Sequence, residues 1–352
     1  MLKSILGRFS HDIGIDLGTA NTLVYVKDKG IVINEPSVVA INTRNDQILA
    51  VGEDAKKMVG KTPPHITASH PLADGVVSDF EVAEKMLKHF IDKVHRESFS
   101  LFPRPRVVIS IPLGVTEVER KAVEDAALNA GARQVFLIQE PMAAAIGARM
   151  PIQEASGNMV VDIGGGTTEV AVISLSGVVT WKSLRIAGNE LDNNIIQYAR
   201  DQFNLLLGEK TAEDIKIKIG SCYTEKEPVE AKMRGRDLIT GLPKEVIITS
   251  AHVREALMRS VKIFVDGIKS TVENTPPELI SDIYERGLVL TGGGALLKGI
   301  DKLIAQETQI PAHIVDDPLT CVVRGTGLVL EDIESLKEIF VLSTHEETVG
   351  TT

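Results

Sequence analysis

The sequence has few of the residues that stabilise extracellular or membrane-spanning proteins. It contains two cysteines, Cys222 and Cys321, which lie far apart with no second cysteine near either one. This usage is typical of a reducing compartment rather than of a disulfide framework. No apolar run approaches the roughly 20 residues of a membrane-spanning helix. The N-terminus is apolar and basic but lacks the long apolar stretch and cleavage site of a signal peptide. We therefore expect a cytoplasmic protein.

Basic residues are also in deficit, because the formal net charge is -10. General nucleic-acid binding needs a basic surface, so this balance argues against a nucleic-acid partner, although it leaves room for a small local basic patch. The hydrophobic share of 43% and the charged share of 24% are those of globular proteins. A chain of 352 residues is too long for one ordinary core and suits two domains.

Two common nucleotide-binding motifs are missing. No G-x-x-x-x-G-K-[ST] string occurs, which excludes a P-loop NTPase. The run Gly164-Gly165-Gly166 does not supply G-x-G-x-x-G at a strand-to-helix turn, so a dinucleotide-binding Rossmann site is unsupported.

Strand-like and helical patterns alternate along the whole chain, which predicts an α/β fold. Ser78–Glu81 has the form of a capping box before a helix with an apolar face, and Thr116–Glu119 has the same form. We expect a less regular helical insertion from about residue 189 to 241, and a long helix capped by Ser250. Strands are expected at 106–112, 134–138 and 288–291, and strand–turn–strand units at 13–26 and 159–174.

The two strand–turn–strand units form an internal repeat. The string IDLGTANT, which begins at Ile15, superposes on VDIGGGTT, which begins at Val161. Each copy has an aspartate near the end of one strand, a glycine two residues later and a hydroxyl-rich turn into the next strand. Repetition in register, about one domain length apart, indicates two related halves with a cleft between them.

These turns have the composition of phosphate-binding loops. Glycine and small residues let the backbone approach a ligand and direct several N–H groups at one anion. The repeated aspartates, Asp16 and Asp162, would repel phosphate, so a cation is expected between them, and Mg²⁺ is commonly held by one or two carboxylates together with phosphates. The alternative is a pair of ordinary hairpins with aspartates at the strand ends. The turns comprise Gly18, Thr19, Ala20 and Asn21 in the first copy and Gly164, Gly165, Gly166 and Thr167 in the second.

Two further segments could hold a nucleoside. The strand-to-helix turn Thr291-Gly292-Gly293-Gly294-Ala295 leaves room for a base or ribose against the backbone, although it could be an ordinary tight turn. Glu213 and Lys216 share a helical face after a Thr211–Asp214 capping box. Their stems could line the nucleoside, or they could form a solvated salt bridge.

Hydrolysis requires a group that orients water. Glu140 lies between a strand and a helix that begins with Pro141, and Thr167 lies beside the expected phosphates. This pair is the candidate catalytic set. The alternative is that Glu140 only interacts favourably with a helix N-terminus.

Taken together, these motifs resemble the actin, Hsp70 and sugar-kinase ATPase superfamily. Within it the chain resembles the MreB family of bacterial actins, through IDLGTANTLVYVKDKGIVINEPSVVAI, HPLADGVVSDFEVAEKML, QEPMAAAIGA and EDIKIKIG. The resemblance covers about residues 10 to 340. It implies an actin-like fold of two related ribonuclease-H-like domains with four subdomains. Domain I would span 1–150, with a small subdomain at about 34–74, and be completed by about 320–345. Domain II would span 151–319, with a small subdomain at about 187–244.

The resemblance also implies roles. Asp16 and Asp162 would be the Mg²⁺-side carboxylates, Glu213 and Lys216 a nucleoside clamp, and Glu140 with Thr167 the water-positioning pair. The family implies ATP and Mg²⁺ as cofactors, slow ATP hydrolysis coupled to polymerisation, and double filaments of the protein itself. Such filaments lie on the inner face of the cytoplasmic membrane and guide the cell-wall elongation machinery that determines rod shape.

Two other functions use the same type of cleft. An Hsp70-like chaperone would continue into a substrate-binding domain of comparable length, and only about ten residues follow the expected core. A small-molecule kinase would need a base for a substrate hydroxyl, and no candidate is evident beyond the aspartates and Glu140.

Two apolar segments predict contact with a lipid surface. Leu2, Ile5, Leu6 and Phe9 would share one face of a short helix, with Lys3 and Arg8 away from it, the pattern of a helix that lies in the membrane interface. Leu101 and Phe102 lie in a second apolar segment that would be costly to expose. The alternative for both segments is packing onto the protein's own core.

Overall fold

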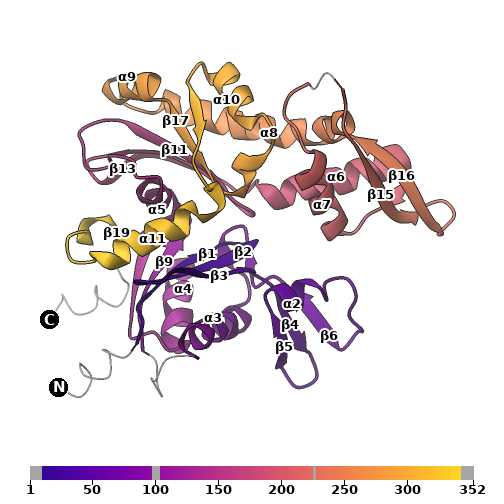
Figure 1. Ribbon diagram of the computed structural model, residues 1–352, viewed down its shortest axis with the longest axis horizontal. Helices are drawn as coiled ribbons and strands as arrows, with labels where there is room; N and C mark the ends of the chain where they lie inside the picture. The colour runs from indigo at the N-terminus through magenta and orange to yellow at the C-terminus, as the bar shows by residue number, and fades with distance from the viewer. Residues whose placement is uncertain (1–9, 97–103, 225–226, 342–352) are drawn as a thin grey trace. The chain divides into compact units, whose positions relative to one another are not determined.

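The computed structural model describes residues 10–96, 104–224 and 227–341 (Figure 1). The chain forms two compact units. Unit 1 contains the described residues of Met1–Ala155, Ile173–Val178 and Leu319–Thr352, and unit 2 contains those of Ser156–Val172 and Val179–Pro318. The predicted lipid-contacting residues Leu2, Ile5, Leu6, Phe9, Leu101 and Phe102 lie outside the described residues. In the described part of the chain, no helix combines the length and apolar character needed to cross a bilayer.

Unit 1 is organised around a six-stranded sheet in the order β19-β10-β9-β1-β2-β3. Strands β1, β9 and β10 are parallel, whereas β2, β3 and β19 run antiparallel to their neighbours. The strands predicted at 13–26, 106–112 and 134–138 are confirmed. The sheet consists of β1 (Ile13–Leu17), β2 (Asn21–Val26), β3 (Gly30–Pro36), β9 (Arg106–Ile111), β10 (Gln134–Gln139) and β19 (Phe340–Val341).

Helices cover both faces of this sheet, with α3 and α4 on one side and α5 and α11 on the other (Figure 1). Apolar residues of α3 repeat at helical spacing and are buried against the sheet, as predicted. The N-cap of α3 is Asp79, whose side chain accepts from the Val82 N–H, so the capping box predicted to begin at Ser78 is wrong by one residue. The Thr116–Glu119 capping box of α4 is confirmed. The bounds are α3 (Phe80–His95), α4 (Glu117–Asn129), α5 (Glu140–Gly147) and α11 (Cys321–Glu331).

A small sheet, in the order β5-β4-β6, branches from the main sheet of unit 1 between β3 and α3. Its own core is formed by Val38, Ala40 and Ala55, the last from α2. The elements are β4 (Val39–Asn42), β5 (Gln47–Val51), α2 (Glu53–Lys56) and β6 (Ile66–Ser69), followed by the hairpin β7 (Leu72–Ala73) and β8 (Val76–Val77).

Unit 2 has a five-stranded sheet in the order β13-β12-β11-β17-β18. The strands predicted at 159–174 and 288–291 are confirmed. The sheet contains β11 (Asn158–Ile163), β12 (Thr168–Ser174), β13 (Gly177–Leu184), β17 (Leu288–Thr291) and β18 (Ala312–Ile314). Helices α8 (Ser250–Glu273), α9 (Pro277–Arg286) and α10 (Ile300–Thr308) accompany it, and a short 3-10 turn, η2, spans Gly293–Leu296.

The insertion predicted as helical at 189–241 is only partly helical. It contains α6 (Gly188–Phe203) and α7 (Glu209–Ile219), but also β14 (Leu205–Leu206) and β15 (Glu230–Asp237), which pair in a sheet with β16 (Pro243–Thr249). Along β15, more buried and more exposed side chains alternate, which is the period-two pattern of a β-strand. Two caps were also misplaced. Thr249, not Ser250, caps α8, and α7 begins at Glu209, so the Thr211–Asp214 string lies inside the helix.

Helices α5 and α11 pack with almost no space between their backbones. A Cβ atom added to Gly325 would lie 1.8 Å from the Ala143 carbonyl oxygen, and one added to Gly147 would lie 1.9 Å from the Cys321 carbonyl oxygen. Backbone atoms cannot move aside as a flexible side chain can, so only glycine fits these two positions.

We expect Gly325→Ala to destabilise unit 1 by roughly 2–3 kcal/mol, because an over-packed core must separate the two helices. Gly208→Ala is a matched control, because its added Cβ would meet nothing within 4 Å. Urea unfolding followed by circular dichroism measures both. Equal midpoints for the two variants would show that α5 and α11 separate at no cost.

Candidate functional site

The turn between β1 and β2 is compact and holds four of the predicted phosphate-binding residues, Gly18 to Asn21. A Cβ atom added to Gly18 would lie 2.7 Å from the Asn21 carbonyl oxygen, so the turn requires glycine there. Asp16 is the fourth residue of β1 and is half-buried. The Ser110 hydroxyl on β9 approaches one Asp16 carboxylate oxygen at 3.4 Å.

This turn is hydrogen-bonded to both chain segments that connect the small β5-β4-β6 sheet to the rest of unit 1. On the entering segment, the Ser37 hydroxyl donates to the Gly18 carbonyl at 2.6 Å, and the Ser37 N–H donates to the Ala20 carbonyl at 3.0 Å. On the leaving segment, the Gly75 N–H donates to the Thr19 hydroxyl at 2.9 Å. Hydrogen bonds therefore fix the turn to both connections. Sequence reasoning missed Ser37, because nothing in its neighbourhood along the chain reveals this contact.

Glu140 lies at the same edge of the sheet as Asp16. It is the first residue of α5 and directly follows β10, and its side chain is buried. Since β1, β9 and β10 are parallel, their carboxyl ends meet at one edge. Unit 1 thus brings together Asp16, Ser110 and Glu140 beside the Gly18–Asn21 turn.

In unit 2, the second aspartate and the predicted nucleoside turn are in direct contact. The Thr291 hydroxyl donates to the Asp162 carboxylate at 2.7 Å. Gly292 has φ of 78°, and a Cβ atom there would lie 2.4 Å from the Ile163 carbonyl oxygen and 2.8 Å from the Asp162 carboxylate. The left-handed backbone and the close approach both require glycine. Ala295 is fully buried next to this turn.

Burial raises the pKa of Asp162 from 3.8 to about 6, against the smaller opposite effect of the Thr291 hydrogen bond. A buried carboxylate is stable as an anion only when a cation or several donors compensate the lost hydration. The Asp162 carboxylate therefore loses hydration in the folded protein that the Thr291 hydroxyl only partly replaces.

The second glycine turn is fixed by the start of α6. The N–H groups of Gly188 and Asn189 donate to the carbonyl oxygens of Gly164 and Gly165 at 3.1 and 2.8 Å. In a planar trans peptide the N–H points opposite to the C=O, so the N–H groups of Gly165 and Gly166 point away from α6. The turn closes through a 2.9 Å bond from the Gly164 N–H to the Thr167 carbonyl.

Lys216 joins α7 to the same turn. Its ammonium group donates to the Gly188 carbonyl at 2.7 Å and pairs with Asp192 at 2.9 Å, and both side chains of this pair are more than four-fifths buried. The Lys216 ammonium group is therefore mostly buried and bound within unit 2, and the alternative of a salt bridge between Lys216 and Glu213 stays untested. Glu213 lies one turn earlier on α7 and is half-buried. Sequence reasoning missed Asp192, which is distant in the chain from Lys216. It placed Thr291 at the start of the nucleoside turn but missed the contact of Thr291 with Asp162.

Unit 2 therefore assembles Asp162, the Gly164–Thr167 turn, Lys216 and the Gly292–Ala295 turn within one network. The predicted pairs Asp16 with Asp162 and Glu140 with Thr167 join residues of different units, and they stay predictions. In the described residues, no group of three or more His, Cys, Asp or Glu side chains forms a potential metal site. Mg²⁺ held by single carboxylates would have to take its other ligands from phosphate and water.

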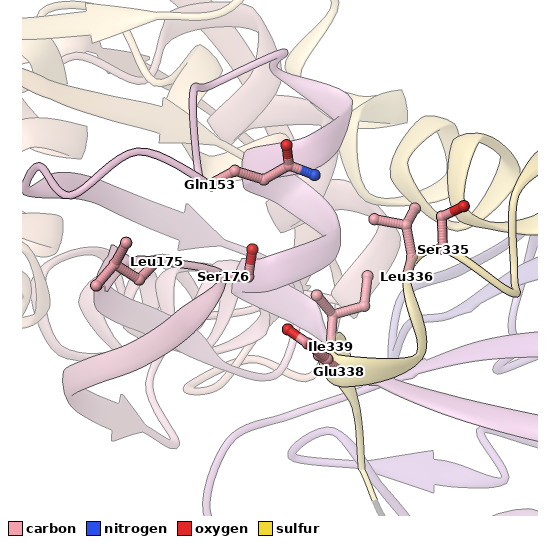
Figure 2. Close-up of a pocket in the computed structure, with 7 residues that line it drawn as sticks. All are labelled: Gln153, Leu175, Ser176, Ser335, Leu336, Glu338 and Ile339. Carbon is pink, nitrogen blue, oxygen red and sulfur yellow. The ribbon is translucent and has the colours of Figure 1, made fainter.

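A pocket of about 310 Å³ lies elsewhere in unit 1 (Figure 2). Leu175 and Ser176, from the turn between β12 and β13, line one side, and Leu336 and Ile339 line the other. None of the predicted site residues contributes to it.

Each unit thus presents a hairpin turn that begins with glycine beside an aspartate on the preceding strand, which is the arrangement of an actin-like nucleotide-binding protein. Residues 10–338 match the model of the MreB/Mbl protein family. The chain belongs to the MreB/Mbl family.

Curated relatives cover almost the whole chain. The cell shape-determining protein MreB of Escherichia coli K12 is 55% identical over 340 residues, which are 95% of this chain and 97% of the relative. The cell shape-determining protein Mbl of Bacillus subtilis 168 is 50% identical over 328 residues, 93% of this chain and 98% of the relative. The chaperone and kinase alternatives find no support among these relatives.

Solved structures show the same fold. MreB5 of Spiroplasma citri bound to ADP is 40% identical, with a TM-score of 0.88 over 94% of this chain and 98% of that one. The same protein has been solved with AMPPNP. A MamK double helical filament is 21% identical with a TM-score of 0.77 over 92% of this chain and 99% of that one, and it supports the fold alone. The predicted actin-like fold is confirmed.

We expect Asp162→Asn to stabilise the nucleotide-free protein at pH 7.5 by about 1–3 kcal/mol. The folded pKa of Asp162 lies above its unfolded value, so the ionised carboxylate disfavours the folded state at pH above about 6. Asparagine removes that cost and can still accept from Thr291. The advantage of the variant should disappear as the pH falls from 6 towards 4, where folded Asp162 is protonated. Thermal unfolding at pH 7.5 and 4.5 measures the difference, and an advantage that is independent of pH would contradict it.

Proposed function

We propose that this protein is an ATP-dependent cytoskeletal filament protein that determines cell shape. The observation that supports this function best is the unit 2 network. It contains the buried Asp162, a glycine turn whose Gly165 and Gly166 N–H groups point away from α6, and the predicted nucleoside turn. Hydrogen bonds of 2.7–3.1 Å hold these parts in place.

In the proposed complex, phosphate oxygens accept from the N–H groups of the turns Gly18–Asn21 and Gly164–Thr167. The N-terminus of α6 adds a favourable dipole behind the second turn. The adenosine lies against Gly292–Ala295, with Glu213 and Lys216 along its side. Mg²⁺ would be held by Asp16 and Asp162 together with the phosphates. A divalent cation at Asp162 would compensate the hydration that the buried carboxylate has lost.

Glu140 is proposed to orient the attacking water, with Thr167 as its partner, in a slow ATPase. Its position fits, because the buried carboxylate and Asp16 lie at one edge of the sheet. The AMPPNP and ADP complexes of the Spiroplasma relative support the choice of an adenine nucleotide.

The protein is further proposed to act from the cytoplasm on the inner face of the cell membrane, as double filaments that guide the cell-wall elongation machinery. The names of the curated relatives support the role in cell shape. In the same proposal, residues 34–74 and 187–244 form the small subdomains of domains 1–150 (with 320–345) and 151–319.

Assembly tests the function directly. The full chain should sediment as filaments with Mg-ATP and stay in solution with EDTA and no nucleotide, and electron microscopy should show paired filaments. Asp16→Ala should bind Mg-ATP at least tenfold more weakly and fail to sediment, because the cation loses one of its ligands. Asp54→Ala, which removes an exposed carboxylate on α2, is the control and should bind Mg-ATP like the wild type. Unchanged Mg-dependent affinity in Asp16→Ala would remove Asp16 from the site.

Glu140→Ala separates binding from hydrolysis. The variant should bind ATP and sediment like the wild type, while phosphate release from assembled protein slows by a factor on the order of 10²–10⁴. Glu140→Gln is the matched variant, because it keeps the shape but cannot accept a proton as a carboxylate does. Phosphate release at the wild-type rate in both variants would return Glu140 to a structural role at the start of α5.

A further inference from the structure

Two donors on one residue hold carbonyl groups of the unit 1 turn. The Ser37 hydroxyl donates to the Gly18 carbonyl at 2.6 Å, and the Ser37 N–H donates to the Ala20 carbonyl at 3.0 Å. Ser37 lies between β3 and β4, and its side chain is fully buried. One residue outside the turn therefore determines the direction of two of its peptide groups.

The direction of these carbonyl groups also sets the direction of the neighbouring N–H groups. In a planar trans peptide the N–H points opposite to the C=O. Because the Gly18 and Ala20 carbonyls point towards Ser37, the N–H groups of Thr19 and Asn21 point away from it. These N–H groups are two of the donors that the proposed function assigns to phosphate oxygens. Ser37 thus orients them from behind the turn.

A second buried hydroxyl fixes the orientation of Ser37. Thr22, on β2, is also fully buried, and its hydroxyl lies 2.8 Å from the Ser37 hydroxyl. A hydroxyl has one proton to donate, and the Ser37 proton is directed at the Gly18 carbonyl, so Thr22 is the donor in this pair. Thr22 therefore holds the Ser37 oxygen in the position from which it donates to Gly18.

The turn of unit 2 receives the same kind of support from two backbone donors. There the Gly164 and Gly165 carbonyls accept from the N–H groups of Gly188 and Asn189. In unit 1 one of the two donors is a side-chain hydroxyl, so a substitution of Ser37 can remove it while the backbone donor stays. The orienting role can therefore be tested in unit 1 with a single variant.

Ser37 also begins the connection to the small β5-β4-β6 sheet. Val38, the next residue, belongs to the core of that sheet, and β4 starts at Val39. On the returning segment, the Gly75 N–H donates to the Thr19 hydroxyl at 2.9 Å. A ligand that holds the turn should therefore also steady both connections of the small sheet.

We propose that Ser37 is a positioning residue for phosphate binding, which aims the Thr19 and Asn21 N–H groups at the phosphates and couples their binding to the small sheet. The inference rests on the phosphate contacts in the proposed function. It adds the residue that orients them and the chain segment that responds. Because Ser37 acts through the turn, its effect on binding is confined to ligands that carry phosphate. That restriction separates positioning from a general contribution to stability.

Calorimetric titration of the full chain tests the assignment. Ser37→Ala should bind Mg-ATP about tenfold more weakly, because a hydrogen bond to a charged group is worth roughly that factor or more and misdirected N–H groups lose part of it. Its affinity for adenosine, which has no phosphate, should equal that of the wild type. Thr22→Val removes only the support of the Ser37 oxygen and should show a smaller loss, again for Mg-ATP alone. Circular dichroism checks that each variant is folded.

Amide hydrogen exchange gives a second readout. In the wild type, Mg-ATP should slow exchange of the Ser37 and Gly75 N–H groups, and adenosine should not. Ser37→Ala should weaken this ATP-dependent protection at Gly75. Ser78→Ala is the matched control, because it removes a serine hydroxyl that donates to the Pro71 carbonyl at 3.0 Å, and it should keep both the affinity and the protection.

Wild-type affinity of Ser37→Ala for Mg-ATP would overturn the assignment. So would an equal loss of affinity for Mg-ATP and adenosine, which would mark a general effect on the fold. Protection at Gly75 that is the same with adenosine as with Mg-ATP would overturn the coupling to the small sheet. If the wild type binds Mg-ATP no more tightly than adenosine, the phosphate contacts of the proposed function are themselves wrong.

Discussion

The unit 2 site depends on a single carboxylate, Asp162, that is buried at the end of a central strand. Hydration lost by this group is only partly replaced by the Thr291 hydroxyl, which is why its pKa rises to about 6. The surrounding backbone accommodates it only because Gly292 and Gly294 have no side chains to collide with Ile163. The network from α7 through Lys216 and Gly188 to the Gly164 turn is built around the same point. Folding thus keeps an anion in a position that a divalent cation would stabilise.

Unit 1 repeats the hairpin but couples it differently. Its glycine turn is bound to Ser37 and Gly75, which are the two segments that lead into and out of the small β4–β6 sheet. In unit 2 the corresponding turn is bound to the first residues of a long helix and, through Lys216, to a second helix. The two copies of the motif therefore have different hydrogen-bond partners. The unit 1 turn contacts the connections of a small sheet, and the unit 2 turn contacts a helix N-terminus.

Much of the fold and of the site was predictable, because local signals carried it. Period-two and helical patterns located β1, β2, β9, β10, β11, β12 and β17, and the repeated Asp-x-Gly strings indicated the two turns. Errors arose where neighbouring residues offered equivalent chemistry. Ser78 and Asp79 can both cap α3, and Thr249 and Ser250 can both cap α8, so only backbone geometry distinguishes them. The strands β14 and β15 were missed because charged residues alternate along β15 without a strongly apolar face.

What the sequence by itself determined is the family, the α/β fold and the list of residues at the two turns, since each of these follows from short strings in register. The tertiary structure decided which distant residues complete them. Ser37 and Asp192 carry no local signal, because a serine or an aspartate is common in any sequence, and Thr291 lies in the predicted nucleoside turn without any sign of its contact with Asp162. Their importance comes from hydrogen bonds across strands and helices that chain proximity does not reveal.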